Sequence, residues 1–317
     1  MTTKQFPELT MGLTSFSAED PGGWAPMLAQ ARAADAAGVD RLVVSDHVVF
    51  GERLDEYGRP EIGGMAGGKQ PTGPDGHWLE PLTTLSVVAG MTKRIRLRTH
   101  ILLAALRRPV ILAKSTATLD VLSEGRLDLG VGVGWQREEY EAAGLSFDGR
   151  GRLLDHSLEV CRTLWREQRA SYHSPELDFD NIHQMPKPLR PEGVPIWVSG
   201  TIRSSTVRRL ARYGARWIPW GADAANLGEA IPRIREALAA AGGDADGLQV
   251  SGYLPVVKGE DGEIDLGRTM DGVVAQVANG VTCFVGSFRL PADQGAAEAR
   301  LRPIVDAFRA AVGREAA

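Results

Sequence analysis

The chain has 317 residues, of which 43% are hydrophobic and 24% charged, with a formal net charge of −4. This composition is that of a globular protein with a sizeable core, and it excludes the concentrated basic surface that nucleic acid or an anionic membrane would require. The N-terminal residues lack the pattern of a signal peptide, and no run of about 18 apolar residues occurs, so we expect a cytoplasmic protein.

The first part of the chain predicts a strand, a helix and a second strand. Residues 9–16 read as the first strand, and the Ala-rich residues 24–37 read as an amphipathic helix that ends at Gly38. Residues 41–45 read as the second strand. The alternation of strand and helix indicates an α/β protein.

A long insertion follows the second strand. Asp46 and His47 come directly after that strand, and residues 51–78 then contain eight glycines and three prolines with little apolar periodicity. Loops of this length inside a compact domain are usually functional or disordered. We therefore predict a mobile loop that acts as a lid over a site at this end of the sheet.

Residues 94–143 predict strand, helix, strand and helix in succession. Apolar residues alternate with charged ones over residues 94–103, and a helix with apolar residues every three to four positions runs from Pro109 to Gly125. In the next strand, aliphatic residues alternate with Asp128 and then with glycines. One face of this strand is therefore bare, and we expect another group to approach it closely.

The remaining chain continues the same alternation after an irregular, polar insertion at residues 168–194. The predicted elements comprise a helix at 80–91, a helix at 148–167, strands at 195–199, 216–220, 249–257 and 281–286, and helices at 203–213, 227–241, 269–279 and 292–312. We predict one domain over residues 1–317, a (β/α)8 TIM barrel with insertions after strands 2 and 4.

In such barrels the site lies at the carboxyl ends of the strands. Asp46 beside His47 suits general acid/base chemistry, because the carboxylate can orient an imidazole that titrates near neutrality. The alternative is a pair that caps the loop. His47 and His100 are the only histidines at strand ends, so we predict no metal site. The spacing of Gly130, Gly132 and Gly134 is not that of a Rossmann dinucleotide loop.

Ser199, Gly200 and Thr201 join the fifth strand to a helix, which places hydroxyls and free N–H groups at a positive helix end. A phosphate fits this position. Ordinary capping of the helix by Thr201 or Ser204 is an equally good interpretation of the same residues.

Two further pairs of side chains follow strand ends. Trp135 and Trp220 have the geometry to wall a flat heteroaromatic ring, although packing is the commoner role of such side chains. Arg107 and Arg108 are placed to meet a polyanionic tail, with a solvated loop as the alternative. Cys161 and Cys283 lie in apolar segments, so they are expected to be small core residues and not a disulfide.

The segments VDRLVVSDHV, TKRIRLRTHILLAALRRPVILAKSTATLDVLSEGRLDLGVGVGW and PIWVSGTIRSSTVRRLARYGARWIPW resemble the bacterial luciferase-like monooxygenase family over most of residues 9–240. The resemblance implies a TIM barrel that binds flavin mononucleotide (FMN) or its deazaflavin analogue, coenzyme F420, and that frequently forms a homodimer. The residues DHVV after the second strand look most like the F420-dependent oxidoreductase branch.

In that branch, the position matching His47 acts near the ring as an acid, base or hydrogen-bonding group, and the positions matching Gly200 and Thr201 hold the coenzyme phosphate. A cis peptide bond that forms a bulge behind the ring matches His100–Ile101. The bare face of the strand with Gly130, Gly132 and Gly134 is then expected to receive the edge of the coenzyme ring. The resemblance accordingly implies a coenzyme site formed by Thr99, His100, Ile101, Gly132, Gly134, Trp135, Ser199, Gly200 and Thr201.

Two departures from the family pattern limit what can be transferred. The sugar-phosphate dehydrogenases of the branch have a glutamate where this chain has Trp135, so their proton donor and substrate do not carry over. Ser199 replaces the first glycine of the usual phosphate turn, which adds a hydroxyl and narrows the approach of the backbone.

The sequence thus predicts an enzyme that transfers a hydride between coenzyme F420 and a small organic substrate, with His47 and Asp46 as catalytic residues. One alternative is a monooxygenase that uses reduced FMN supplied by a separate flavin reductase. A second alternative is a non-catalytic flavin-binding protein. No nucleic acid and no membrane is an expected partner.

Overall fold

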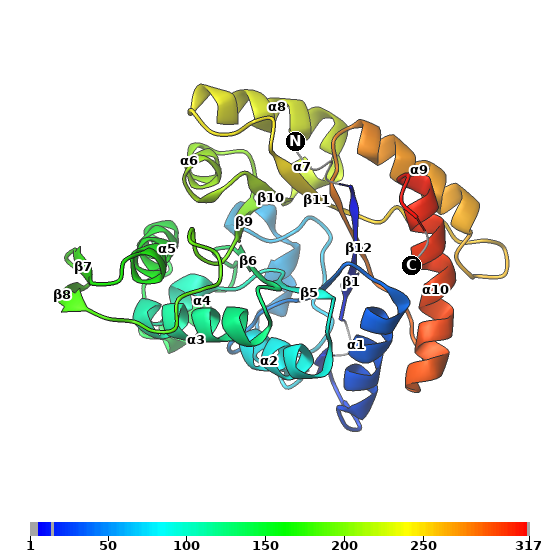
Figure 1. Cartoon of the computed structure of the whole chain (residues 1–317), viewed down its shortest axis with the longest axis horizontal. Coiled ribbons are helices and arrows are strands. Elements are labelled where there is room, and N and C mark those ends of the chain that lie inside the picture. The colour runs from blue at the N-terminus through cyan, green and yellow to red at the C-terminus, as the bar shows by residue number, and fades with distance from the viewer. Residues whose placement is uncertain (1–5, 14–15, 316–317) are drawn as a thin grey trace.

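The computed structural model describes residues 6–13 and 16–315. Eight parallel strands close into a barrel, because β1 pairs with both its neighbours, β12 and β3. Helices surround this ring of strands (Figure 1). In barrel order the strands are β1 (Glu8–Gly12), β12 (Cys283–Gly286), β11 (Gln249–Tyr253), β10 (Arg216–Pro219), β9 (Ile196–Gly200), β6 (Leu127–Val131), β5 (Arg96–Thr99) and β3 (Arg41–Val44). The predicted (β/α)8 barrel is confirmed.

The helices cover the outer face of the barrel with their apolar sides. Several begin at a proline in the first turn, and the first ends at Gly38, whose φ of 86° is left-handed as expected for a C-cap glycine. Their bounds are α1 Ala25–Ala37, α2 Pro81–Met91, α3 Pro109–Leu122, α4 Arg137–Ala142, α5 Arg150–Arg166, α6 Ser204–Tyr213, α7 Ala222–Ala225, α8 Leu227–Ala240, α9 Leu266–Ala278 and α10 Gln294–Ala311.

Element boundaries differ from the predicted ones where loops begin. The first strand ends at Gly12 and not at Phe16, and residues 14 and 15 of the predicted strand lie outside the described residues. β11 ends at Tyr253, four residues before the predicted end at 257. The ninth helix begins earlier than predicted, because Asp265 caps it by accepting a hydrogen bond from the N–H of Arg268.

Both insertions carry more structure than predicted. Residues 51–78 contain two short 3-10 helices, η2 (Leu54–Gly58) and η3 (Pro60–Ile62), and β4 (His77–Trp78), which pairs with β2 (Ser17–Ala18). The prediction that residues 168–194 are irregular is wrong. They contain an antiparallel hairpin of β7 (Ala170–His173) and β8 (Asp178–Ile182), which stands out beyond α5 in Figure 1.

The interior of the barrel is charged. Arg41 donates to Glu8 at 2.5 Å and to Asp128 at 2.9 Å, and Arg96 also pairs with Asp128, at 2.5 Å. Arg98 lies with its guanidinium carbon 4.3 Å from the centre of the Trp197 ring. A group of paired charges therefore fills the barrel below its carboxyl end, where many barrels have aliphatic layers.

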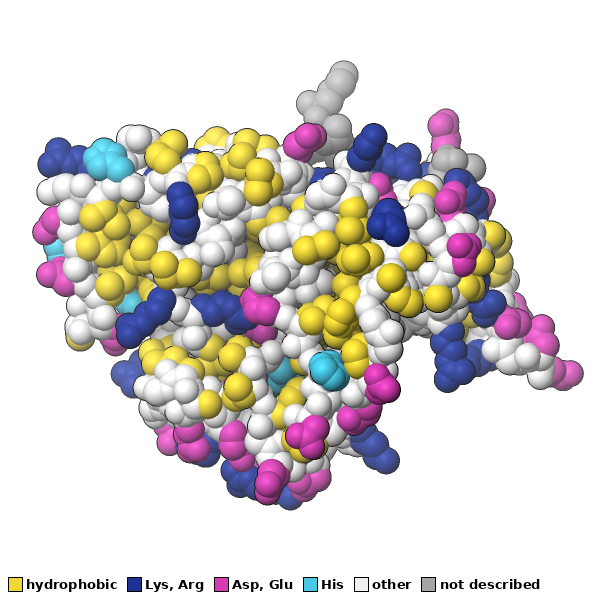
Figure 2. All heavy atoms as spheres, turned by 90° about the horizontal axis from the view of Figure 1, so that it is seen from below, with side chains coloured by type: hydrophobic (Ala, Val, Ile, Leu, Met, Phe, Trp, Pro, Cys, Tyr) yellow, Lys and Arg dark blue, Asp and Glu magenta, His cyan; other side chains and the backbone are white. Residues whose placement is uncertain are grey.

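Figure 2 views the molecule from the side on which α1, α2 and α3 lie in Figure 1, and hydrophobic side chains gather there between scattered charged ones. The exposed apolar side chains include Ile111 and Leu122 of α3 and, in the segment beside that helix, Met185 and Leu189. Cys161 and Cys283 are buried and unpaired, as predicted. No helix in the described part of the chain is long and apolar enough to cross a membrane.

Candidate active site

The carboxyl ends of the barrel strands open into a cavity of about 890 Å³. The structure brings almost all the predicted site residues together around it. Those that line the cavity are Asp46, His47, His100, Ile101, Gly132, Gly134, Trp135, Ser199, Gly200 and Thr201. Thr99 is the exception, because its side chain is buried and its hydroxyl donates to the carbonyl oxygen of Gly130 at 2.7 Å.

His47 has a carboxylate neighbour that differs from the predicted one. Its Nδ1 lies 3.3 Å from Oε2 of Glu139, a buried residue of α4. The other oxygen of Glu139 accepts a hydrogen bond from the N–H of Val48 at 2.8 Å, which fixes the carboxylate against the chain that carries His47. The buried Glu139 carboxylate thus lies beside Nδ1 of His47, and the His47 imidazole lines the cavity, where it is placed to exchange a proton with a ligand.

Asp46 does not orient His47. Its carboxylate pairs with Arg107 through two contacts, at 2.6 and 3.1 Å, and also accepts from the N–H of Leu103 at 2.8 Å. Arg107 donates in addition to Glu80 at 2.8 Å. Through these contacts Asp46 links the end of β3 to the segment after β5. The suggestion that Arg107 meets a polyanionic tail is wrong, because its guanidinium is already engaged by two carboxylates.

The peptide bond between His100 and Ile101 is cis, as the resemblance implied. The bare glycine face of β6 lies against this part of the chain and not only against the cavity. A Cβ on Gly130 would lie 2.1 Å from the carbonyl oxygen of Thr99, and one on Gly132 would lie 2.3 Å from Cδ1 of Ile101. The expectation of a ring against this face therefore needs correction, since the segment after β5 occupies much of the space.

Trp78 of the lid segment, residues 51–78, and Trp135 after β6 lie beside His47. The His47 ring centre lies 4.9 Å from that of Trp78 in an edge-on arrangement, and Trp135 lies 6.1 Å away. Trp220 donates from its indole N–H to the carbonyl oxygens of Gly63 and Gly64 at 3.0 and 3.2 Å. The lid segment thus contacts both predicted tryptophans and forms part of the cavity wall.

The loop from Ser199 to Thr201 leads to the N-terminus of α6. Gly200 has a φ of 149°, and a Cβ at this position would lie 3.1 Å from the Thr206 hydroxyl. No side-chain cap is made at the N-cap residue, Arg203, so neither of the predicted caps forms. An uncapped helix start beside a cavity is suited to bind an anion.

Arginines extend this anion site along one wall of the cavity. The lining includes Arg150 and Arg152 from α5, Arg203, and Arg208 and Arg209 from α6. Arg209 pairs with Asp155 at 2.5 Å. Within residues 6–13 and 16–315, no carboxylate forms an ion pair with Arg152, Arg203 or Arg208, and all three side chains are exposed. The wall therefore carries more positive charge than one phosphate needs.

The family model of the luciferase-like monooxygenases matches residues 9–264. The chain belongs to the luciferase-like monooxygenase family. Among relatives of the family, an uncharacterized protein of Mycobacterium bovis is 34% identical over 166 residues, which are 52% of this chain. The chain spans 58% of the length of that relative.

Solved structures with the same fold include enzymes with either coenzyme. An F420-dependent secondary alcohol dehydrogenase, in complex with an F420-acetone adduct, has a TM-score of 0.71 at 17% identity, and the match covers 96% of this chain and all 100% of that one. The oxygenating constituent of 3,6-diketocamphane monooxygenase from Pseudomonas putida, in complex with FMN, has a TM-score of 0.61 at 16% identity. This match covers 98% of this chain and 90% of that one. At these identities the likeness shows the luciferase-like fold alone.

Sequence reasoning missed Glu139 and the arginines of α5 and α6. Glu139 and Tyr140 are the buried residues of α4, and the sequence of this short helix carries no pattern that marks Glu139 as the buried carboxylate. The arginines of α5 and α6 are far apart in sequence, and only the packing of both helices beside the cavity brings them together.

Proposed function

We propose that this member of the luciferase-like family is an oxidoreductase that transfers a hydride between coenzyme F420 and a small organic substrate. The observation that carries the proposal is the wall of arginines beyond the loop at Ser199–Thr201. The resemblance to the family implies either FMN or F420, and the two coenzymes differ most in the charge that follows the ring.

FMN ends in one phosphate, whereas the phosphate of F420 continues into a tail that carries several carboxylates. The uncapped start of α6 would hold the phosphate in either case. Arg152, Arg203 and Arg208 would then be left without an anionic partner if FMN were bound, but they would meet the carboxylates of an F420 tail. The charge of this wall favours F420.

The described side chains fit the rest of the coenzyme and a substrate. The cavity has the size of an ordinary cofactor site, and Ile101, Trp135 and Trp220 provide apolar surface for a flat ring. When bound, the coenzyme supplies the hydride chemistry. His47 would hold or release the accompanying proton at a ring nitrogen, with the Glu139 carboxylate beside its Nδ1.

The lid segment would exclude water from the reaction. Tyr57 and Trp78 of this segment line the cavity, and Tyr57 lies between the two tryptophans, with ring centres 5.5 Å from Trp135 and 6.2 Å from Trp220. A closed aromatic cover of this kind strengthens the electrostatic contacts beneath it. The homodimer and the flavin reductase partner stay predictions from the resemblance.

The arginine wall can be tested with the double variant Arg152→Ala/Arg208→Ala. We expect its dissociation constant for F420 to rise about 10-fold, because two exposed ion pairs of up to about 1 kcal/mol each are lost, while FMN binding changes less than about twofold. Equilibrium titration of the apoprotein, followed by fluorescence, measures both. Arg268→Ala on α9 is the matched control, an exposed arginine outside the cavity lining.

Equal weakening of both coenzymes would show that the two arginines bind only the phosphate that FMN and F420 share. In that case the wall no longer favours F420, and the monooxygenase alternative with reduced FMN gains the advantage.

A further inference from the structure

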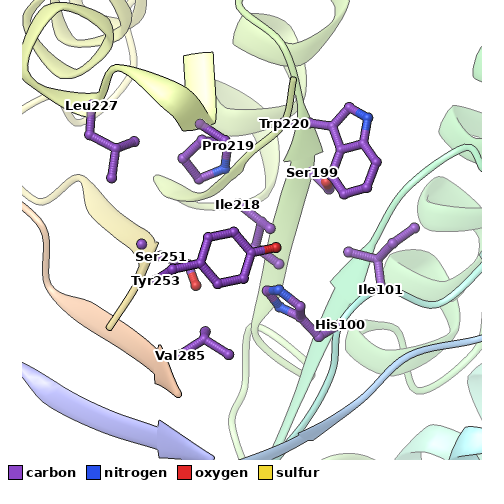
Figure 3. A pocket seen from close by; sticks show the side chains of 12 residues that line it. His100, Ile101, Ser199, Ile218, Pro219, Trp220, Leu227, Ser251, Tyr253 and Val285 are labelled. Atoms are coloured by element: carbon purple, nitrogen blue, oxygen red, sulfur yellow. The ribbon is translucent and has the colours of Figure 1, made fainter. Parts of the chain in front are cut away.

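A small chamber opens beside the large cavity, on the side of β9 to β12. The two share His100, Ile101, Ser199, Trp220 and Tyr253 as lining residues. Figure 3 shows the His100 ring inside this chamber, facing Tyr253. Its volume of about 30 Å³ admits a polar group of one or two heavy atoms and not a whole substrate.

Arg98 contacts His100 from inside the barrel. Its guanidinium donates to the Ser251 hydroxyl at 3.2 Å and lies 3.3 Å from Nδ1 of His100. Arginine carries only donors, so Nδ1 of His100 must be the acceptor in this contact. The proton of a neutral His100 ring is consequently on Nε2.

His100 is neutral at physiological pH. Burial lowers its pKa from 6.5 to about 3, and the positive charge of Arg98 contributes to the shift. No hydrogen bond from Nε2 to another side chain or to the backbone is formed within the described residues. The Nε2–H group therefore faces the chamber without a protein acceptor.

We propose that His100 is a fixed hydrogen-bond donor for a carbonyl oxygen of a bound ligand, and that Arg98 is the positioning residue that sets its tautomer. The inference rests on the proposed function only in that a flavin-type coenzyme occupies the adjoining cavity. A carbonyl oxygen accepts without donating, and it fits the volume of the chamber.

The charges beneath the chamber favour an oxygen that gains negative charge during a reaction. Arg41 and Arg96 share the carboxylates of Glu8 and Asp128, whereas Arg98 forms no ion pair with any described carboxylate. The excess positive charge therefore lies next to His100. Both a carbonyl of the coenzyme's pyrimidine ring and a ketone substrate offer such an oxygen.

The substitutions His100→Leu and His100→Gln test the donor. Leu removes it, whereas Gln keeps an N–H group at about the reach of Nε2. If the ligand is the coenzyme, His100→Leu raises the dissociation constant for F420 about 10-fold and His100→Gln restores most of the affinity. If the ligand is a substrate ketone, F420 binding is unchanged, and the affinity of the F420-loaded protein for carbonyl-labelled ¹³C-acetone falls by a similar factor in His100→Leu alone.

The proposal is overturned if both variants bind F420 and acetone as the wild type does. The proposed function could fail separately, if the wild type does not bind F420. In that case the same titrations with FMN still test the donor, because FMN carries the same pyrimidine carbonyl groups as F420.

The tautomer of His100 has its own test. Nitrogen-15 NMR of the wild type at pH 7, with the signal assigned by its loss in His100→Gln, should show a neutral ring protonated at Nε2. In Arg98→Gln this preference should weaken, an effect that a purely structural role of Arg98 would not produce. A ring protonated at Nδ1 or at both nitrogens in the wild type would contradict the proposal.

Discussion

The carboxylate beside His47 comes from Glu139 and not from Asp46, its neighbour in the sequence. Asp46 is adjacent in the chain but binds Arg107 and the N–H of Leu103, while Glu139 reaches His47 from a helix more than 90 residues later. Adjacent residues on an extended chain point in opposite directions, so a pair such as Asp46 and His47 rarely shares a contact. The sequence predicted a carboxylate beside His47, but the fold places Glu139 there and not Asp46.

The two carboxylates should therefore respond differently to loss of charge. Asp46→Asn breaks a buried ion pair and should lower the free energy of unfolding by about 3 kcal/mol. Glu139→Gln keeps an oxygen for the N–H of Val48 but removes the negative charge beside Nδ1 of His47, so it should lower turnover at least about 10-fold with a smaller loss of stability.

Urea unfolding and steady-state turnover of both variants, each with saturating coenzyme, measure this contrast. Loss of turnover in Asp46→Asn without loss of stability, together with full turnover in Glu139→Gln, would return the catalytic role to Asp46.

At the scale of elements, the contact between β5 and β6 explains the glycine pattern of residues 130–134. The N–H of Leu102 donates to the carbonyl oxygen of Gly130 at 2.7 Å, and the N–H of Gly132 donates to that of Leu102 at 3.2 Å. Alternation in the sequence correctly predicted both strands. It also indicated that something approaches the glycines, but the period of a single strand cannot say whether that neighbour is a ligand or another segment of the chain.

Replacement of Gly130 tests this contact. In Gly130→Ala the new methyl group meets the Thr99 carbonyl oxygen, a backbone atom that cannot rotate away, so the free energy of unfolding should fall by about 3 kcal/mol. Gly90→Ala in α2 is the matched control, because nothing lies within 4 Å of that position, and it should gain about 0.5 to 1 kcal/mol. Thermal unfolding measures the stability of both variants. Equal stability of the two would show that the Thr99 carbonyl oxygen does not lie close to Gly130.

The hairpin of β7 and β8 shows a second limit of periodicity. Apart from the buried Ala170, its residues are exposed or only partly buried, and the rings of Tyr172 and Phe179 contact each other with centres 6.1 Å apart. A strand without a fully buried face shows little apolar alternation. The barrel strands could be predicted because each has a buried face, and the hairpin could not.

At the scale of the molecule, the barrel determines which residues form the site. Eight strand ends meet at one rim, so the predicted residues from β3, β5, β6 and β9 line one cavity even though they are spread over more than 150 positions. The charge of the wall formed by α5 and α6 depends on how two helices pack and was not predictable from either one. The expected homodimer stays a prediction, and the exposed apolar side chains along α3 are a candidate contact surface for it.

The proposed function requires that the cavity bind F420 in preference to FMN. The most direct measurement is an equilibrium titration of the wild-type apoprotein with each coenzyme, side by side at the same ionic strength. The arginine wall predicts a dissociation constant for F420 at least about 10-fold below that for FMN, with a difference that narrows as salt is added. Micromolar or tighter binding of FMN without binding of F420 would contradict the claim.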